Sequence, residues 1–260
     1  MAYLTRLRAP SGAIGYRSPA LAAAGVPHWF ATRALEGADE DERERDLGPL
    51  DAARAARLAE AAGAPGRGVV RVHQVHGARV VEADEADAEP LLRADAIVAT
   101  EPRALALVRA ADCVPVLLAT PDGSRVAAVH AGWRGIVAGA IPAALERLDA
   151  GAPVVAAVGP CISAAHFEVG EDVADEFRSA ELGECVLERD GARPLVDLRR
   201  AARLQIQRAS PGATVDESDR CTYAHGAELW SHRRDVTHGG ARSTGRQGAV
   251  IGVRSEGSTV

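Results

Sequence analysis

The spacing of apolar and polar positions predicts short strands along most of the chain, joined by a smaller number of amphipathic helices. Short runs of Val, Leu, Ile and Ala that end at Gly, Pro or Asp are typical of strands. We interpret the first thirty residues as short extended segments of this kind. The later strands expected on the same basis comprise residues 28–33, 69–75, 79–82, 95–100, 105–108, 114–120, 126–130, 154–159, 220–223 and 249–253.

Helical spacing of apolar residues, together with residues that favour helix ends, predicts the helices. The clearest one begins at Asp51, whose side chain suits a helix N-terminus, and ends before Gly63. Another contains Pro142 in its first turns, where a missing N–H is tolerated. The expected helices comprise residues 51–62, 136–148, 171–177 and 198–208.

Turn residues connect the expected strands in two places. Pro121-Asp122-Gly123 is a strong turn signal and predicts a hairpin between the strands on either side of it. His76-Gly77 is expected to form a turn between two further strands. Hairpins and helices follow one another without a regular strand–helix–strand repeat. This pattern favours an α+β fold with mixed β-sheets and helices, in a single domain over residues 1–260.

Composition narrows the functional classes. The chain is 47% hydrophobic and carries a net charge of −6, with an acidic stretch at residues 34–49 that we expect to be a surface loop. This mild, dispersed charge does not suggest a nucleic-acid or membrane partner. All 30 basic residues are Arg, so no Lys can act as a Schiff base or general base. Neither a signal peptide nor a transmembrane segment is visible, and the four scattered Cys favour free thiols in the cytoplasm.

The strongest candidate for chemistry is a set of two His and one Cys, each beside a small or turn-forming residue. His76 precedes Cys113 by 37 residues, and His130 follows Cys113 by 17, so the spacing is not that of a zinc finger. Three protein ligands leave one coordination position open, as in catalytic zinc sites. Two alternatives stay open: His73 is a rival ligand or an outer partner, and Cys113 is a nucleophile with His130 as its base.

Five groups of motifs surround these residues in a fixed order. They are Gln74-Val75-His76-Gly77, Ala111-Asp112-Cys113, His130-Ala131-Gly132-Trp133-Arg134-Gly135, Gly159-Pro160-Cys161-Ile162 with Phe167-Glu168-Val169-Gly170, and Ser231-His232-Arg233-Arg234-Asp235 with Thr244-Gly245-Arg246. With them the chain resembles the laccase-domain family, also called the YfiH-like or multicopper polyphenol oxidase family, over residues 28–253. The resemblance implies zinc bound by His76, Cys113 and His130, and a sandwich of mixed sheets.

The resemblance also implies a function. Members of the family are described as enzymes that cleave purine nucleosides, such as adenosine, inosine and methylthioadenosine, with phosphate and that deaminate adenosine. A zinc ion with an open position lowers the pKa of a bound water, which suits attack on C6 of adenine. One Cys-His-His site suits zinc better than copper, because a multicopper oxidase needs more His ligands than one such site provides. Copper, with phenol oxidation as a side activity, is the alternative that the family's older name suggests.

Arginines and carboxylates of the motifs supply candidates for substrate binding. A guanidinium group binds phosphate through paired hydrogen bonds, which makes Arg134, Arg233, Arg234 and Arg246 the candidates for a phosphate site. Proton transfer in deamination needs a carboxylate. The candidates for that role are Asp112, Glu168 and Asp235, and Glu168 is also expected to contact the substrate.

Other functions remain open. One is a cysteine hydrolase or amidase that edits peptidoglycan precursors, a role described within the family. Another is a non-catalytic partner of cell-envelope proteins, although an open metal site has no use there. The chain departs from the family at Ala202, where Asn is expected, and has a Gly-rich insertion between Asp235 and Thr244. These departures concern segments expected to contact the substrate, whereas the three metal-ligand motifs are intact. We expect a monomer.

Overall fold

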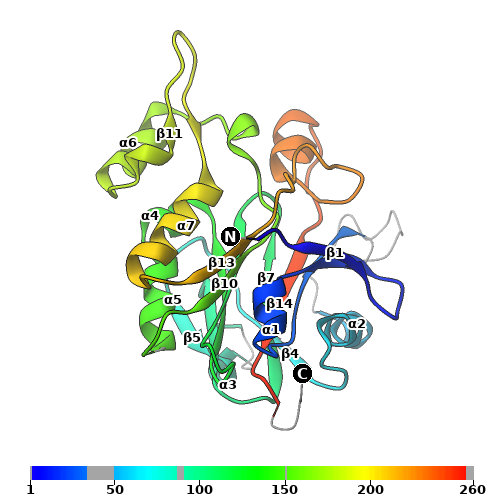
Figure 1. Cartoon of the computed structure of the whole chain (residues 1–260). Helices are drawn as coiled ribbons and strands as arrows, with labels where there is room; N and C mark the ends of the chain where they lie inside the picture. The colour runs from blue at the N-terminus through cyan, green and yellow to red at the C-terminus, as the bar shows by residue number, and fades with distance from the viewer. Residues whose placement is uncertain (1, 34–49, 87–90, 150, 256–260) are drawn as a thin grey trace.

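The computed structural model describes residues 2–33, 50–86, 91–149 and 151–255 (Figure 1). The acidic stretch 34–49, expected to be a surface loop, lies outside these residues. Within the described chain, twelve strands form two six-stranded sheets, and two further strands form a small hairpin.

Sheet I has the strand order β1-β2-β3-β14-β7-β4. All neighbouring strands in it are antiparallel except β4 and β7, which are parallel, so the sheet is mixed. The strands are β1 (Thr5–Arg8), β2 (Ile14–Arg17), β3 (His28–Ala31), β14 (Gln247–Gly252), β7 (Ala104–Ala110) and β4 (Gly68–Arg71).

Sheet II has the order β13-β10-β8-β9-β6-β5 and is also mixed, since β10 and β13 are parallel and β5 and β6 are parallel. Its strands are β13 (Thr214–Glu217), β10 (Val155–Val158), β8 (Val114–Ala119), β9 (Val126–Ala131), β6 (Ala96–Ala99) and β5 (Val80–Glu82). The hairpin of β11 (Val186–Leu187) and β12 (Leu195–Val196) projects from one end of the molecule, at the top of Figure 1.

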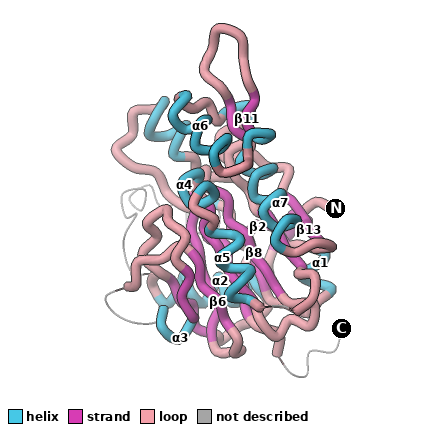
Figure 2. Tube along the Cα trace, turned by 90° about the vertical axis from the view of Figure 1, so that its left-hand side faces the viewer, coloured by secondary structure: helices cyan, strands magenta, loops and turns pink. Residues whose placement is uncertain are grey.

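Helices cover the outer faces of the two sheets. In Figure 2, α5 and α7 lie over the face of sheet II that is turned towards the viewer. On the opposite side, α2 packs on sheet I through Leu58 and its alanines, against Leu105, Leu107 and Val250. The helices are α1 (Pro19–Ala23), α2 (Ala52–Ala62), α3 (Ala83–Ala86), α4 (Trp133–Val137), α5 (Ala140–Leu148), α6 (Glu171–Ser179) and α7 (Leu198–Ala209), with 3₁₀ turns η3 (Ala164–His166) and η4 (Gly183–Cys185) and a π-helix, η5 (Arg233–His238).

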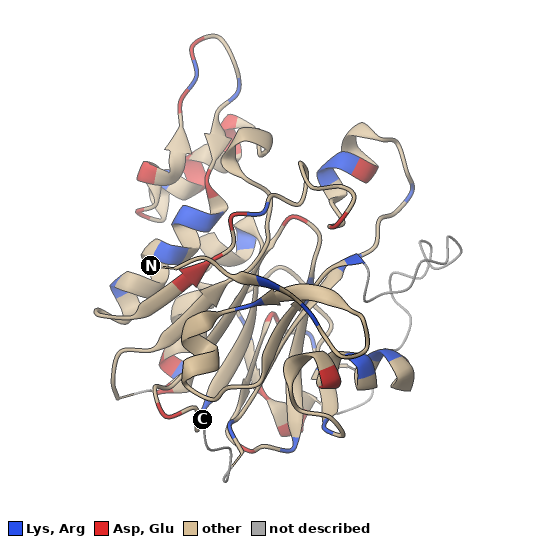
Figure 3. Ribbon diagram, turned by 45° about the vertical axis from the view of Figure 1, so that its right-hand side comes forward, with Lys and Arg blue, Asp and Glu red and all other residues tan. Residues whose placement is uncertain are grey.

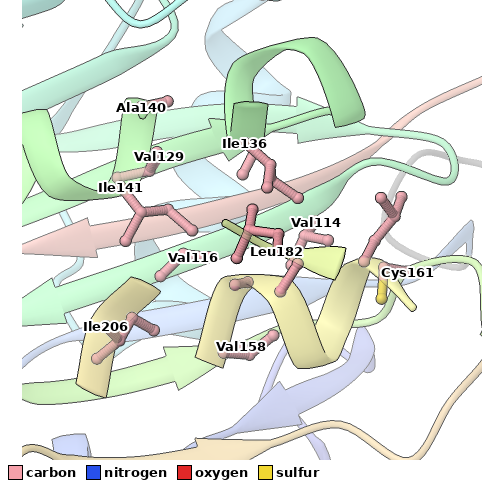
Figure 4. Close-up of a cluster of buried hydrophobic side chains, with 14 of the residues drawn as sticks. Val114, Val116, Val129, Ile136, Ala140, Ile141, Val158, Cys161, Leu182 and Ile206 are labelled. Carbon is pink, nitrogen blue, oxygen red and sulfur yellow. The ribbon is translucent and has the colours of Figure 1, made fainter. Parts of the chain in front are cut away.

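The core therefore has four layers, helix, sheet, sheet and helix. Between sheet II and its helices, Val114, Val116 and Val129 pack against Ile141 and Ile206 (Figure 4). A second set of buried side chains fills the space between the sheets, among them Phe30, Ile97, Val108, Leu117 and Ile251. This arrangement confirms the expected α+β fold with mixed sheets between helices.

The helix at 51–62 and the hairpin at 114–130 are confirmed. Asp51 accepts a hydrogen bond from the N–H of Arg54, and Gly63 ends α2 in the left-handed region at φ 83°. In the hairpin, β8 and β9 pair over their whole length. Asp122 fixes the turn because its carboxylate accepts from the Thr120 hydroxyl at 2.6 Å and from the Ser124 N–H at 3.1 Å.

The prediction of one helix over 136–148 is wrong. Helix α4 begins earlier, after Gly132, and Gly139 interrupts the helix at φ 79°. The following α5 restarts at Ala140, so Pro142 is its third residue. The first residues of a helix have N–H groups without an intrahelical acceptor, and Pro therefore removes no hydrogen bond there.

The prediction of a strand at 220–223 is also wrong. Only Cys221 makes an isolated bridge there, with Cys161. Side chains take the backbone groups that a ladder would use: the Cys221 N–H donates to His225, and the Arg220 N–H donates to the Ser218 hydroxyl. The sheet is extended instead by β13, which the sequence pattern did not predict. Helix α1 was likewise missed within the first thirty residues.

Two chain connections cross from sheet I to sheet II at the same end of the sandwich. One joins β4 to β5, and the other joins β7 to β8. The strand expected over 69–75 ends at Arg71 because the chain leaves sheet I there, and β4 and β5 are not hairpin partners. No helix among the described residues has the length and apolar character needed to cross a membrane.

Candidate metal centre

The two crossing connections bring His76 and Cys113 together beside the end of β9, which carries His130. One ligand atom from each of these residues lies within 4.8 Å of the others, and among the described residues no other group of three His, Cys, Asp or Glu gathers in this way. The rings of His76 and His130 meet edge to face, with centroids 4.8 Å apart. The sequence prediction of these three residues as neighbours is confirmed in space.

Gly132 leaves room for the three side chains. A Cβ atom at this position would lie 3.0 Å from Sγ of Cys113 and 3.0 Å from Cδ2 of His76. Any larger residue would therefore push the thiol and the imidazole apart. The backbone of Gly132 itself is unstrained, at φ −71° and ψ 169°, so its role is to provide space and not an unusual conformation.

Asp95 connects the two histidines, although no motif of the sequence singles it out. It is fully buried just before β6. Its Oδ1 accepts a hydrogen bond from Nδ1 of His130 at 2.8 Å and from the N–H of His76 at 2.9 Å. Its Oδ2 accepts from the N–H groups of Val75 and Gly77. The carboxylate therefore favours the tautomer with the proton on Nδ1, which leaves the Nε2 lone pair of His130 available to the site.

One residue of the three-residue group, His76, and Asp112, which precedes Cys113, have positive φ angles that are uncommon outside glycine. His76 has φ 61° and Asp112 has φ 90°. Asp95 holds the first through the bonds described above. The carboxylate of Asp112 accepts from the Thr222 hydroxyl at 2.5 Å and from the N–H of Arg233 at 2.7 Å, which holds the second. Strained backbone of this kind often marks functional sites.

Electrostatic coupling within the site favours a thiolate. Burial raises the pKa of Cys113, but the adjacent His130 and His76 outweigh burial and lower it. For His130, burial lowers the pKa, whereas the Cys113 thiolate and the Asp95 carboxylate raise it by more. A deprotonated thiol is the form that binds metals and attacks electrophiles.

A cleft of about 890 Å³ opens above the three residues. Phe167, Val169 and Trp133 supply apolar surface along its walls, and six arginines also line it. The guanidinium of Arg134 lies over the ring of Trp133, 4.2 Å from its centroid. Figure 3 shows basic and acidic residues interspersed along the chain, and the projecting hairpin carries both.

The structure places most of the candidate substrate-binding residues in this cleft. Arg134, Arg233, Arg246 and Glu168 all line it. Arg233 also donates to the backbone oxygen of Glu168 at 2.9 Å, and the Glu168 carboxylate forms an ion pair with Arg189.

The other candidates lie elsewhere or are held by neighbours. Arg234 is not among the described lining residues; it donates to the backbone oxygens of Thr222, Tyr223 and Leu229. Asp235 accepts from Thr244 and Arg234. His73 lines the cleft but does not join the three-residue group.

The fold and the site define a two-sheet sandwich protein in which a His-Cys-His group that could hold a metal ion lines a cleft together with six arginines. The chain belongs to the family described as multi-copper polyphenol oxidoreductase laccase, whose model matches residues 49–254. This confirms the resemblance drawn from the motifs.

Similar proteins are found among both curated sequences and solved structures. A purine nucleoside phosphorylase from Deinococcus radiodurans is 42% identical over 255 residues, which cover 94% of each chain. The purine nucleoside phosphorylase Rv2149c of Mycobacterium tuberculosis is 41% identical over 72% of this chain and 76% of its own. The crystal structure of Neisseria meningitidis protein NMB0706 matches 97% of this chain and 99% of its own, with a TM-score of 0.72 and 28% identity. That of YlmD from Geobacillus stearothermophilus matches 93% and 96%, with a TM-score of 0.75 and 26% identity.

Proposed function

We propose that this protein is a zinc-dependent enzyme that cleaves purine nucleosides, among them adenosine, inosine and methylthioadenosine, with inorganic phosphate and also deaminates adenosine. The observation that carries the proposal is that His76, Cys113 and His130 gather in the lining of a cleft that six arginines also line. The names of the Deinococcus and Mycobacterium relatives support purine nucleosides as the substrate class.

The donor set fits a zinc ion. His76, Cys113 and His130 would hold it, and the space that Gly132 leaves lets their donor atoms converge. Three protein ligands of this type are typical of catalytic zinc sites with one open position. When bound, zinc supplies a Lewis acid that can lower the pKa of a water molecule. Copper is the alternative suggested by the family's description, but the described residues bring only two of the eight His into this group.

The residues of the chain supply the remaining functions. Asp95 keeps His130 oriented by accepting from its Nδ1. The faces of Phe167 and Trp133 offer surfaces on which a purine ring can stack. Phosphate would bind to cleft arginines, for which Arg134, Arg233 and Arg246 are the motif candidates. In phosphorolysis a phosphate oxygen forms a bond to C1′ of the ribose while the bond from C1′ to the purine nitrogen breaks.

The test is to incubate the purified protein with adenosine, with and without phosphate, and to resolve adenine, inosine and hypoxanthine by chromatography. We expect base release that requires phosphate, and inosine formation that does not. Both should be lost in His76→Ala and Cys113→Ala. Cys185→Ala is a matched control, because Cys185 is buried in the core and does not line the cleft. The absence of turnover by zinc-loaded protein would contradict the proposal.

A second candidate function is a cysteine hydrolase or amidase that edits peptidoglycan precursors. Cys113, His130 and Asp95 form a chain of neighbours in the order of a nucleophile, a base and an orienting carboxylate. Metal dependence separates the two functions. A hydrolase of this kind keeps its activity with a chelator and loses it on thiol alkylation, whereas the zinc enzyme loses its activity with the chelator.

A further inference from the structure

Three of the six cleft arginines come from one region of sheet I. Arg71 is the last residue of β4, Arg109 lies near the end of β7, and Arg246 directly precedes β14. These strands are neighbours in the order β14-β7-β4. All three arginines line the cleft. They lie at the strand ends where the chain leaves sheet I towards Cys113.

The strand register places the three side chains on one face. Arg71 pairs with Leu107, and Arg109 follows Leu107 by two positions. Arg109 pairs in turn with Gly248, which Arg246 precedes by two positions. Alternate residues of a strand point to the same side, so the three positions share a face and form a diagonal row. Neighbours in such a row are about 5–8 Å apart, which lets three long guanidinium side chains reach one anion.

Gln74 fixes the backbone of the middle arginine. Its side-chain Nε2 donates to the carbonyl oxygen of Arg109 at 2.7 Å, and its Oε1 accepts from the Arg109 N–H at 2.8 Å. This pair of hydrogen bonds also ties the connection that carries His76 to the strand that leads to Cys113. A backbone held in this way reduces the ordering that ligand binding would otherwise require.

The charge around the row favours an anion. Only two acidic residues are found among the described residues that line the cleft, Asp112 and Glu168. Asp112 accepts hydrogen bonds from Thr222 and Arg233, and Glu168 is paired with Arg189. The cleft is therefore basic in a protein whose net charge is −6.

We propose that Arg71, Arg109 and Arg246 form a phosphate-binding subsite, separate from Arg134 beside Trp133. The fork of a guanidinium group matches two oxygens of a phosphate, and three forks can surround one. The inference rests on the proposed function in one respect, because it assigns a location to the phosphate that phosphorolysis consumes. The same chemistry would accept the phosphoryl group of a nucleoside monophosphate, so the experiment has an arm for each source.

Calorimetric titration of the full-length protein with inorganic phosphate tests the subsite without any need for turnover. We expect Arg71→Met and Arg109→Met each to raise the dissociation constant about tenfold or more. Arg103→Met is the matched control, because Arg103 is highly exposed, pairs with Glu101 and does not line the cleft. Arg109→Lys keeps the charge but not the fork, and should give an intermediate constant. A thermal unfolding curve for each variant confirms that it is folded.

Two results would overturn the subsite. One is a dissociation constant that stays within twofold for both inorganic phosphate and adenosine 5′-monophosphate in Arg71→Met and Arg109→Met. The other is a loss of phosphate binding confined to Arg134→Met. Titration with adenosine 5′-monophosphate distinguishes the sources: a tenfold loss for this ligand alone assigns the subsite to a substrate's own phosphoryl group, and a loss for inorganic phosphate assigns it to the co-substrate.

The subsite and the proposed function fail in different ways. Phosphate binding that depends on these arginines, in a protein that turns over no nucleoside, would support the subsite and contradict the function. Phosphate-dependent cleavage of adenosine, with an unchanged KM for phosphate and an unchanged dissociation constant for adenosine 5′-monophosphate in Arg71→Met and Arg109→Met, would support the function and overturn the subsite.

Discussion

Oδ1 of Asp95 lies 2.8 Å from Nδ1 of His130, and the same oxygen accepts the backbone N–H of His76. One buried carboxylate therefore orients the ring of the first histidine and holds the backbone of the second. Asp95 also stabilises the left-handed conformation of His76, because its Oδ2 accepts the N–H groups of the residues before and after that histidine. The geometry of the site depends on Asp95 as much as on the three candidate ligands.

The variant Asp95→Asn is expected to weaken zinc binding by about 10–100-fold, because the amide cannot serve as an anionic acceptor for Nδ1 of His130. Competition with a chromogenic chelator measures this affinity. Asp122→Asn is a suitable control, because Asp122 also accepts several hydrogen bonds but lies in the turn between β8 and β9. An unchanged zinc affinity in Asp95→Asn would show that the carboxylate does not support the ligands.

The variant Gly132→Ala is expected to lower zinc affinity by about tenfold or more while the protein stays folded. The new methyl group would meet the thiol of Cys113 and the ring of His76 at 3.0 Å, so these donors must move apart. Gly68→Ala is the matched control, since a Cβ at Gly68 has no neighbouring atom within 4 Å. Equal zinc affinities in the two variants would mean that the site tolerates the displacement.

The break between α4 and α5 leads to a prediction about stability. Gly139 has φ 79°, a region that costs an ordinary L-residue about 1–2 kcal/mol. Gly139→Ala should therefore reduce the free energy of unfolding by about that amount in urea titrations. Gly139→Asn should lose less, because Asn tolerates the left-handed region better. If the two variants were equally stable, the left-handed conformation would not be the cause.

The fold was predictable from the sequence where local signals agree with the final packing. Asp51 and Gly63 bound a helix by their own hydrogen bonds and backbone conformation, and the turn at Asp122 closes a hairpin locally. Residues 220–223 were misread because the side chains of Ser218 and His225 accept the backbone N–H groups that a strand would use. Residues 69–75 were misread because the chain leaves sheet I after Arg71, and Asp95, distant in sequence, holds the backbone around His76.

The site shows the same division. The grouping of His76, Cys113 and His130 was predicted because their short motifs are distinctive. Asp95 was missed, since an acidic residue before an apolar run is ordinary in sequence, and only burial next to His130 distinguishes it. Arg71 and Arg109 were missed for a related reason: only the register of β4, β7 and β14 places them in one row.

Burial of His28 makes stability depend on pH. The ring is completely buried; its Nε2 accepts from the N–H of Ser18 and its Nδ1 donates to the oxygen of Val26. Burial, the dominant cause, lowers its pKa from 6.5 to about 4. The folded state therefore keeps the ring neutral while the unfolded state binds a proton below pH 6.5. The contribution of His28 to the free energy of unfolding is complete above pH 6.5 and is lost progressively as the pH falls towards 4.

The variant His28→Asn retains a donor for Val26 but does not titrate. It should be less stable than the wild type at pH 7, because it fills the site poorly. The difference in the free energy of unfolding between the two proteins should then shrink by about 2 kcal/mol between pH 7 and pH 5. Only the wild type must release a proton from residue 28 on folding in this range, and this lowers its stability. Urea unfolding at pH 7, 6 and 5 measures this difference. A difference that stays constant over the range would mean that His28 titrates normally in the folded protein.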